Sequence, residues 1–263
     1  MNFIETLKRF RFFQYSYKEP AEFYSHQIKV PNLVSKFSGM DVFSANYKIP
    51  NVCVIMSIIY MTVYFCINTT SAYELRHSTE DLINCWITIG IAIQGASKII
   101  TFAIFRKKLV WLHQYTEMLY REECNSRTRV LLSKNVFLLS VILKAMLVCY
   151  AFTSFSLDFA PLLILAFTGE KMLPFGFHVP FIDRFSLSGY TINYLVQIVL
   201  TVFVSSCDMG PDCIYMLLSM NSFTQIDLIM ESLKELSRRI EANDIEVDTC
   251  FEHIIKRHQE HLQ

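Results

Sequence analysis

The chain has 263 residues, of which 52% are hydrophobic and only 18% are charged, and its mean hydropathy is +0.32. This composition excludes an intrinsically disordered chain and is unusual for a water-soluble domain. The 24 basic and 24 acidic residues balance, so the charge gives no indication of a nucleic-acid partner. We therefore expect a membrane protein that has the lipid bilayer as its surroundings.

Four apolar stretches are long enough to cross a bilayer as helices, which takes about 20 residues. The hydrocarbon core contains no water to hydrogen-bond unpaired backbone groups, and a helix pairs these groups internally. The predicted fold class is therefore an all-α polytopic membrane bundle. The predicted spans are residues 49–73, 82–105, 135–157 and 185–207.

Basic residues are distributed unevenly among the segments that join these spans. One predicted side of the membrane carries 19 Lys and Arg and the other carries 3, with two more inside spans. Since basic residues accumulate in cytoplasmic segments, residues 1–48 and 222–263 are predicted to be cytoplasmic and residues 49–221 to form the membrane domain. Apolar residues recur at helical spacing in 222–263, which predicts an amphipathic helical extension with a break at residues 242–244.

Two lysines lie inside the predicted spans. Lys144 is near the middle of the third span, where a charge costs about 2.5 to 3.5 kcal/mol on insertion scales. Its side chain either extends along the helix to the cytoplasmic surface or marks a polar cavity or subunit contact. Lys98 is nearer the cytoplasmic end of its span, so we expect it to reach that surface and assign it no function.

No residue pattern indicates catalysis, and we do not expect an enzyme. The sequence contains no P-loop, no glycine-rich nucleotide-binding turn and no nucleophile elbow. His258 and His261 share a helical face, but two histidines are too few for a di-metal membrane enzyme, so no metal or cofactor is expected. The eight cysteines avoid both predicted outer connections, and the only glycosylation sequon, at Asn68, lies close to the bilayer.

Aromatic and polar side chains mix in the outer halves of spans two, three and four. Pockets for small molecules have mainly apolar walls with a few orienting polar groups, and helical bundles often contain one. An aromatic belt at the membrane interface or a packed bundle core would require similar residues, so these interpretations are kept beside the pocket. The candidate ligand-binding residues are Trp86, Tyr150, Thr153, Tyr190, Asn193, Tyr194 and Gln197.

Several motifs in the second half of the chain resemble the insect odorant receptor family. A Leu-Pro-Phe motif at 173–175 and a Pro-Phe-x-Asp motif at 180–183 are similar to that family's proline-rich second outer loop. A Tyr-x-Ile-x-Tyr-x-x-Gln motif at 190–197 resembles its fourth span. The other similar positions are Asp212, Gln225 and residues 254–258.

The resemblance implies a seven-span receptor with a cytoplasmic N-terminus, of which four spans are present and a fifth is expected after Gln263. Such receptors lie in the plasma membrane of sensory neuron dendrites and form hetero-oligomers with an olfactory co-receptor. The complex is an odorant-gated cation channel, in which small volatile organic odorants bind within the bundle and the last span lines the pore.

The expected function is therefore odorant binding and, with the co-receptor, ligand-gated cation conduction in the complete protein. Two alternatives are kept. A gustatory receptor of the same superfamily would share the topology and the number of spans. A non-conducting four-span membrane scaffold would need neither a ligand nor a pore.

Overall fold

The computed structural model describes residues 19–44, 47, 51–122 and 128–242, together with 248, 251–252, 254–256 and 259. Helices account for most of these residues and none of them lies in a strand, which confirms the predicted all-α class. The helices are α2 (Pro20–Gln27), α3 (Lys29–Phe37), α4 (Val52–Glu74), α5 (Thr79–Glu122), α6 (Thr128–Thr168) and α7 (Leu187–Glu241).

The helices α4, α5, α6 and α7 are each long and apolar enough to cross a membrane. They cover the four predicted spans except for a few residues at two starts, since α4 begins at Val52 and α7 at Leu187. The polytopic helical bundle and its membrane association are thus confirmed. Large apolar side chains are exposed along them; Ile58 and Ile59 of α4, for example, are 57% and 51% exposed. Exposure on this scale is unfavourable in water, whereas lipid tails solvate such side chains.

The helix α7 extends well beyond the predicted span. It is continuous over 55 residues and passes through Asp208, Asp212 and the predicted domain boundary at residue 222. The predicted span ended at residue 207 because carboxylates are costly in lipid. Both carboxylates are paired with Lys98, so they do not end the helix. The end of α7 at Glu241 matches the predicted break.

The sequence analysis did not predict α2 and α3, which lie before the first span. A tight turn ends α3, in which the Gly39 N–H donates to the Lys36 carbonyl at 3.0 Å. Gly39 has φ +80°, and a Cβ at this position would lie 2.6 Å from the backbone nitrogen of Val54 in α4. The positive φ and the close approach both require glycine here.

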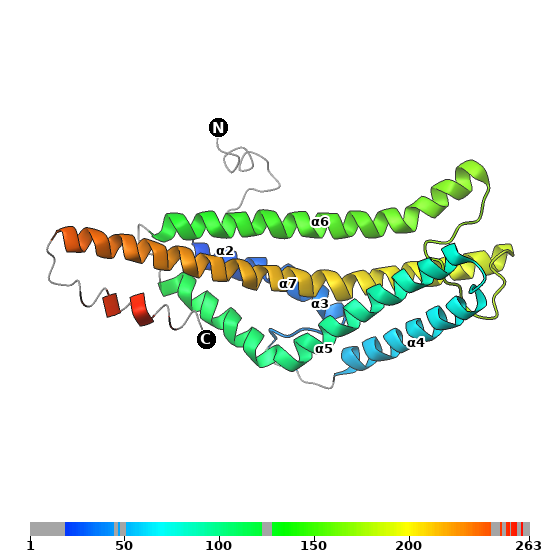
Figure 1. The fold of residues 1–263 in the computed structure, drawn as a ribbon, viewed down its shortest axis with the longest axis horizontal. Coiled ribbons are helices and arrows are strands. Elements are labelled where there is room, and N and C mark those ends of the chain that lie inside the picture. Colours follow the sequence, from blue (N-terminus) through cyan, green and yellow to red (C-terminus); the bar gives the residue numbers. More distant parts are fainter. Residues whose placement is uncertain are drawn as a thin grey trace. The chain divides into compact units, whose positions relative to one another are not determined.

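The chain divides into two compact units. Unit 1 comprises Met1–Ile28, Trp111–Lys144 and Tyr215–Gln263, and unit 2 comprises Lys29–Val110 and Ala145–Ile214. Figure 1 shows the long helices α5, α6 and α7. Each of them contributes residues to both units. Unit 2 also holds α3, α4 and the connection between α6 and α7, residues 169–186.

Stacked aromatic rings form the core of unit 1. Tyr24 of α2 lies on Tyr120 of α5 with 5.1 Å between ring centroids, and both side chains are buried. The Tyr24 hydroxyl is 3.2 Å from His113 Nδ1, and the Tyr120 hydroxyl donates to Asn221 Oδ1 of α7 at 3.4 Å. Stacking and hydrogen bonds therefore act together to join α2, α5 and α7 within this unit.

Small residues allow the helices of unit 2 to approach closely. A Cβ on Gly95 of α5 would lie 3.2 Å from Met61 Cε of α4 and 3.6 Å from Cys207 Cβ of α7. A Cβ on Gly210 of α7 would collide with the backbone of Ser35 in α3. Close packing at small residues replaces the hydrophobic driving force that lipid does not supply.

Candidate ligand cavity

A cavity of about 240 Å³ lies within unit 2 among α4, α5, α6, α7 and the connection 169–186. Apolar side chains and several hydroxyl groups form its walls, a combination typical of small-molecule sites. Its volume is below the range of about 300 to 1,000 Å³ for common ligand pockets, so it suits a small molecule. The lining residues are Tyr64, Ile91, Gln94, Tyr150, Thr153, Ser154, Leu157, Phe175, Leu200, Thr201, Val204, Ser205 and Asp208.

Two of the seven predicted ligand-binding residues line this cavity. They are Tyr150 and Thr153, which lie on α6. Trp86 of α5 is 62% exposed and is not among the lining residues, so its position suits contact with lipid. The other four lie on α7 and bind backbone groups; they are Tyr190, Asn193, Tyr194 and Gln197.

Asn193 and Gln197 hold the connection 169–186 through its backbone. Asn193 Oδ1 accepts a hydrogen bond from the Val179 N–H at 2.6 Å. Gln197 Oε1 accepts from the Phe175 N–H at 3.0 Å, and its Nε2 donates to the Phe177 carbonyl at 2.5 Å. Both amide side chains are fully buried. They therefore position Phe175, which lines the cavity, instead of lining it themselves.

Tyr190 and Tyr194 also act on backbone groups. Their rings are stacked with centroids 5.9 Å apart. The Tyr190 hydroxyl donates to the Met172 carbonyl at 3.1 Å, and the Tyr194 hydroxyl donates to the Asp158 carbonyl of α6. This pair of rings thus links α7 to the connection and to α6.

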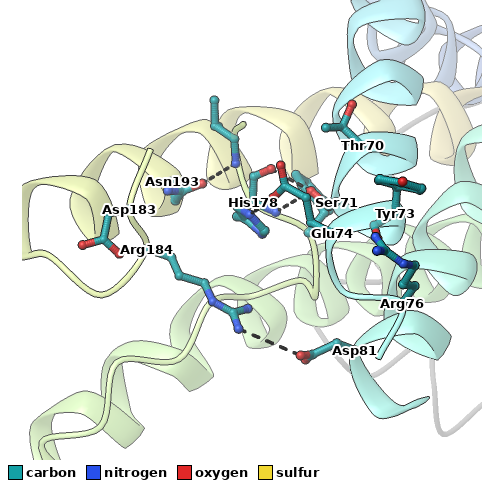
Figure 2. A network of polar contacts seen from close by, with 12 residues as sticks. Thr70, Ser71, Tyr73, Glu74, Arg76, Asp81, His178, Asp183, Arg184 and Asn193 are labelled. Carbon is teal, nitrogen blue, oxygen red and sulfur yellow. Dashed lines mark hydrogen bonds and ion pairs between the residues drawn. The ribbon is translucent and has the colours of Figure 1, made fainter. Parts of the chain in front are cut away.

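The other side of the connection is bound to α4 and α5 (Figure 2). Ser71 Oγ donates to the His178 carbonyl at 2.7 Å and accepts from the His178 N–H at 3.0 Å. His178 Nε2 lies 2.8 Å from Glu74 Oε2, and Arg184 lies 4.0 Å from Asp81 of α5. The connection is thus held by three helices, and its Phe175 forms part of the cavity wall.

A buried ion cluster adjoins the cavity; we call Lys98, Asp208, Asp212 and Tyr150 the Lys98 cluster. Lys98 Nζ is 2.8 Å from Asp208 Oδ1 and 2.9 Å from Asp212 Oδ2, and the Tyr150 hydroxyl donates to Asp212. The sequence predicted no partner for Lys98, whereas two carboxylates of α7 bind its ammonium group; whether it reaches the membrane surface stays a prediction. Asp208 and Tyr150 bring this cluster into the cavity wall.

A pattern in the sequence could have revealed more of the lining. Polar residues recur along α7 every three or four positions, which places them on one helical face. The residues predicted to bind a ligand lie in the outer half of this span, so the polar residues nearer its middle were not predicted. The stripe consists of Asn193, Gln197, Thr201, Ser205, Asp208 and Asp212.

Asn68, the residue of the predicted sequon, is buried in α4. Its Nδ2 donates to the Tyr64 carbonyl at 3.0 Å, and its Oδ1 accepts from Thr88 Oγ1 of α5 at 2.6 Å. The Tyr64 hydroxyl donates to the Thr88 carbonyl at 3.3 Å. The Asn68 amide therefore joins α4 to α5 and is not accessible to a glycosylating enzyme in this conformation.

Lys144 is half-buried on α6, and both roles predicted for it stay predictions. Among the described residues, no group of three or more His, Cys, Asp or Glu side chains is arranged to hold a metal ion. The predicted pair His258 and His261 lies outside the described residues.

Comparison with known proteins finds no family model that matches this chain and no curated protein that resembles it. The function must therefore be argued from the cavity, the residues that cover it and the sequence motifs.

Proposed function

We propose that the chain is an odorant receptor subunit whose cavity in unit 2 binds a small volatile organic molecule. The observation that supports this most directly is a space of about 240 Å³ lined by parts of four apolar helices and by Phe175 of the connection 169–186. Apolar walls suit a volatile compound, and the hydroxyl groups of Thr153 and Thr201 can orient one polar group.

The sequence motifs support the same proposal. Phe175 belongs to the Leu-Pro-Phe motif at 173–175 and lines the cavity. Gln197 ends the motif at 190–197 and binds the backbone of Phe175. Two motifs that are separate in sequence thus meet in one structural feature, the cover of the cavity.

We place this receptor in the plasma membrane of a sensory neuron dendrite, with a cytoplasmic N-terminus. The 19 to 3 distribution of basic residues supports this orientation, which would put the connection 169–186 on the outer side. Conduction is proposed for the full receptor complex with the olfactory co-receptor and not for these four helices alone. Gating then requires that the odorant bind the open state more tightly than the closed state.

The first test is ligand binding by the purified chain in lipid nanodiscs. Volatile alcohols, esters and ketones would compete with an apolar fluorescent probe, and we expect several to displace it. Thr153→Trp places a large ring in the cavity and should abolish displacement, whereas Thr62→Trp, on an exposed position of α4, should not. Equal displacement in both variants, or none in the unmodified chain, would contradict the proposal.

A second test separates the receptor classes. The full receptor that contains these four helices would be expressed with an olfactory co-receptor, and ligand-evoked cation currents would be recorded. Currents evoked by volatile compounds support an odorant receptor, and responses confined to non-volatile tastants would favour the gustatory alternative. Binding of the co-receptor without any ligand response would favour the scaffold.

A further inference from the structure

The Lys98 cluster carries more negative than positive charge. Asp208 and Asp212 share the one ammonium group of Lys98, at 2.8 Å and 2.9 Å. Tyr150 adds a hydroxyl that donates to Asp212, which contributes a hydrogen bond but no charge. In the part of the chain that the structure describes, no second cationic group pairs with either carboxylate. With both carboxylates ionised, the cluster has one net negative charge.

This excess charge is partly removed from solvent. Asp208 is only 7% exposed, the Asp212 side chain is 30% exposed, and both lie on a helix with the composition of a membrane span. A buried charge without a full counter-charge is unfavourable, and more so where the surroundings are lipid. A bound proton or a second cation would offset it.

The cavity meets this cluster through its acidic member. Asp208 lines the cavity, and Lys98 is not among the lining residues. Lys98 Nζ donates to Asp208 Oδ1. Because a carboxylate has about four acceptor positions, Asp208 can also accept a hydrogen bond from a ligand in the cavity. Thr201 and Ser205, on the same face of α7, line the space beside it.

We propose that the cavity takes a small organic amine, whose ammonium group pairs with Asp208 while its carbon skeleton lies against Ile91 and Leu200. The proposal rests on the function proposed above, since it names the ligand class of the same cavity. An inorganic cation would leave the apolar walls without a contact. The rings of Tyr64 and Phe175 line the same space and are suited to an ammonium group because their faces are electron-rich.

The test compares matched pairs of ligands on the purified chain in nanodiscs at neutral pH. Benzylamine is paired with benzyl alcohol, and hexylamine with hexanol, so that each pair differs only in the polar group. At this pH the amines are protonated, as a lysine side chain is. We expect the amine of at least one pair to bind ten times more tightly than its alcohol.

The outcomes separate the two proposals. If the alcohols bind as tightly as the amines, the amine proposal is overturned while the cavity keeps its proposed function. If no amine, no alcohol and no other volatile compound binds, both proposals fail. Neither result depends on a variant, so failure of a variant to fold leaves the test intact.

Two variants test whether Asp208 is the residue that makes amines bind more tightly than alcohols. Asp208→Asn keeps an acceptor for Lys98 and removes the charge, so it should lower amine affinity at least tenfold and leave alcohol affinity within twofold. Glu170→Gln, at an exposed carboxylate of the connection, controls for net charge and should bind as the unmodified chain does. Loss of the preference in Glu170→Gln, or its retention in Asp208→Asn, would contradict the assignment.

Discussion

Units 1 and 2 share three helices but fill their interiors differently. Unit 1 buries Tyr24, Tyr120 and Phe137 completely, and the space beside Leu228 measures about 10 Å³. Unit 2 leaves about 240 Å³ where α7 presents small side chains such as Thr201, and a second space of about 890 Å³ beside the connection 169–186. Small side chains on α7 thus leave room in unit 2, whereas Tyr115 and Leu119 of α5 fill the corresponding space in unit 1. We therefore treat unit 2 as the proposed binding region and unit 1 as its proposed support.

The largest loss of stability is expected when the Lys98 cluster of unit 2 loses its ammonium group. Lys98→Met removes the only ammonium group of the Lys98 cluster and leaves two carboxylates close together. Breaking a buried ion pair in this way costs about 3 to 5 kcal/mol, so we expect the free energy of unfolding in mixed detergent to fall by about that amount. Asp208→Asn in the same chain should restore part of it. A double variant no more stable than Lys98→Met would show that the two residues are not coupled.

A smaller loss of stability is expected when Gln197 of α7 no longer binds the backbone of the connection 169–186. Gln197→Leu would leave the Phe175 N–H and the Phe177 carbonyl without their side-chain partner, at about 1 to 3 kcal/mol for a buried polar group. Hydrogen exchange at residues 173–179 should become faster, and ligand affinity should fall because Phe175 is displaced. Thr62→Leu, on an exposed position of α4 outside the cavity lining, is the control and should change stability by less than about 0.5 kcal/mol. Unchanged exchange in Gln197→Leu would show that the connection is held by other contacts.

These two predictions also show how far the sequence could be interpreted. The spans could be predicted because lipid requires long apolar helices, and Gln197 stood out because a polar side chain in such a helix must find a partner. Whether that partner is a ligand or the backbone of Phe175 depends on how the connection returns over the bundle, which no local pattern contains. Lys98 and Asp208 are 110 positions apart, so their pairing could not be read from spacing.

A modest effect is expected in the packed core of unit 1. Tyr120→Phe removes the hydroxyl that donates to Asn221 but keeps the stacked ring, and the loss of one such hydrogen bond costs about 1 kcal/mol. Ligand affinity should stay unchanged, because Tyr120 belongs to the unit without the cavity. Tyr215→Phe is the matched control, since Tyr215 is 71% exposed. If Tyr120→Phe altered ligand affinity, the division into a binding unit and a supporting unit would be wrong.

The smallest effect is expected at a helix crossing of unit 2, and it tests how tightly this unit is packed. A methyl group on Gly95 would lie 3.2 Å from Met61 Cε, the end of a flexible side chain that can move by a few tenths of an ångström. Alanine favours a helix over glycine by about 1 kcal/mol, which offsets this displacement. We therefore expect Gly95→Ala to change the free energy of unfolding by less than about 0.5 kcal/mol. Gly210→Ala, whose new methyl would meet the Ser35 backbone, should cost about 1 to 3 kcal/mol. A large loss in Gly95→Ala would mean that Met61 cannot move aside and that this helix crossing is tightly packed.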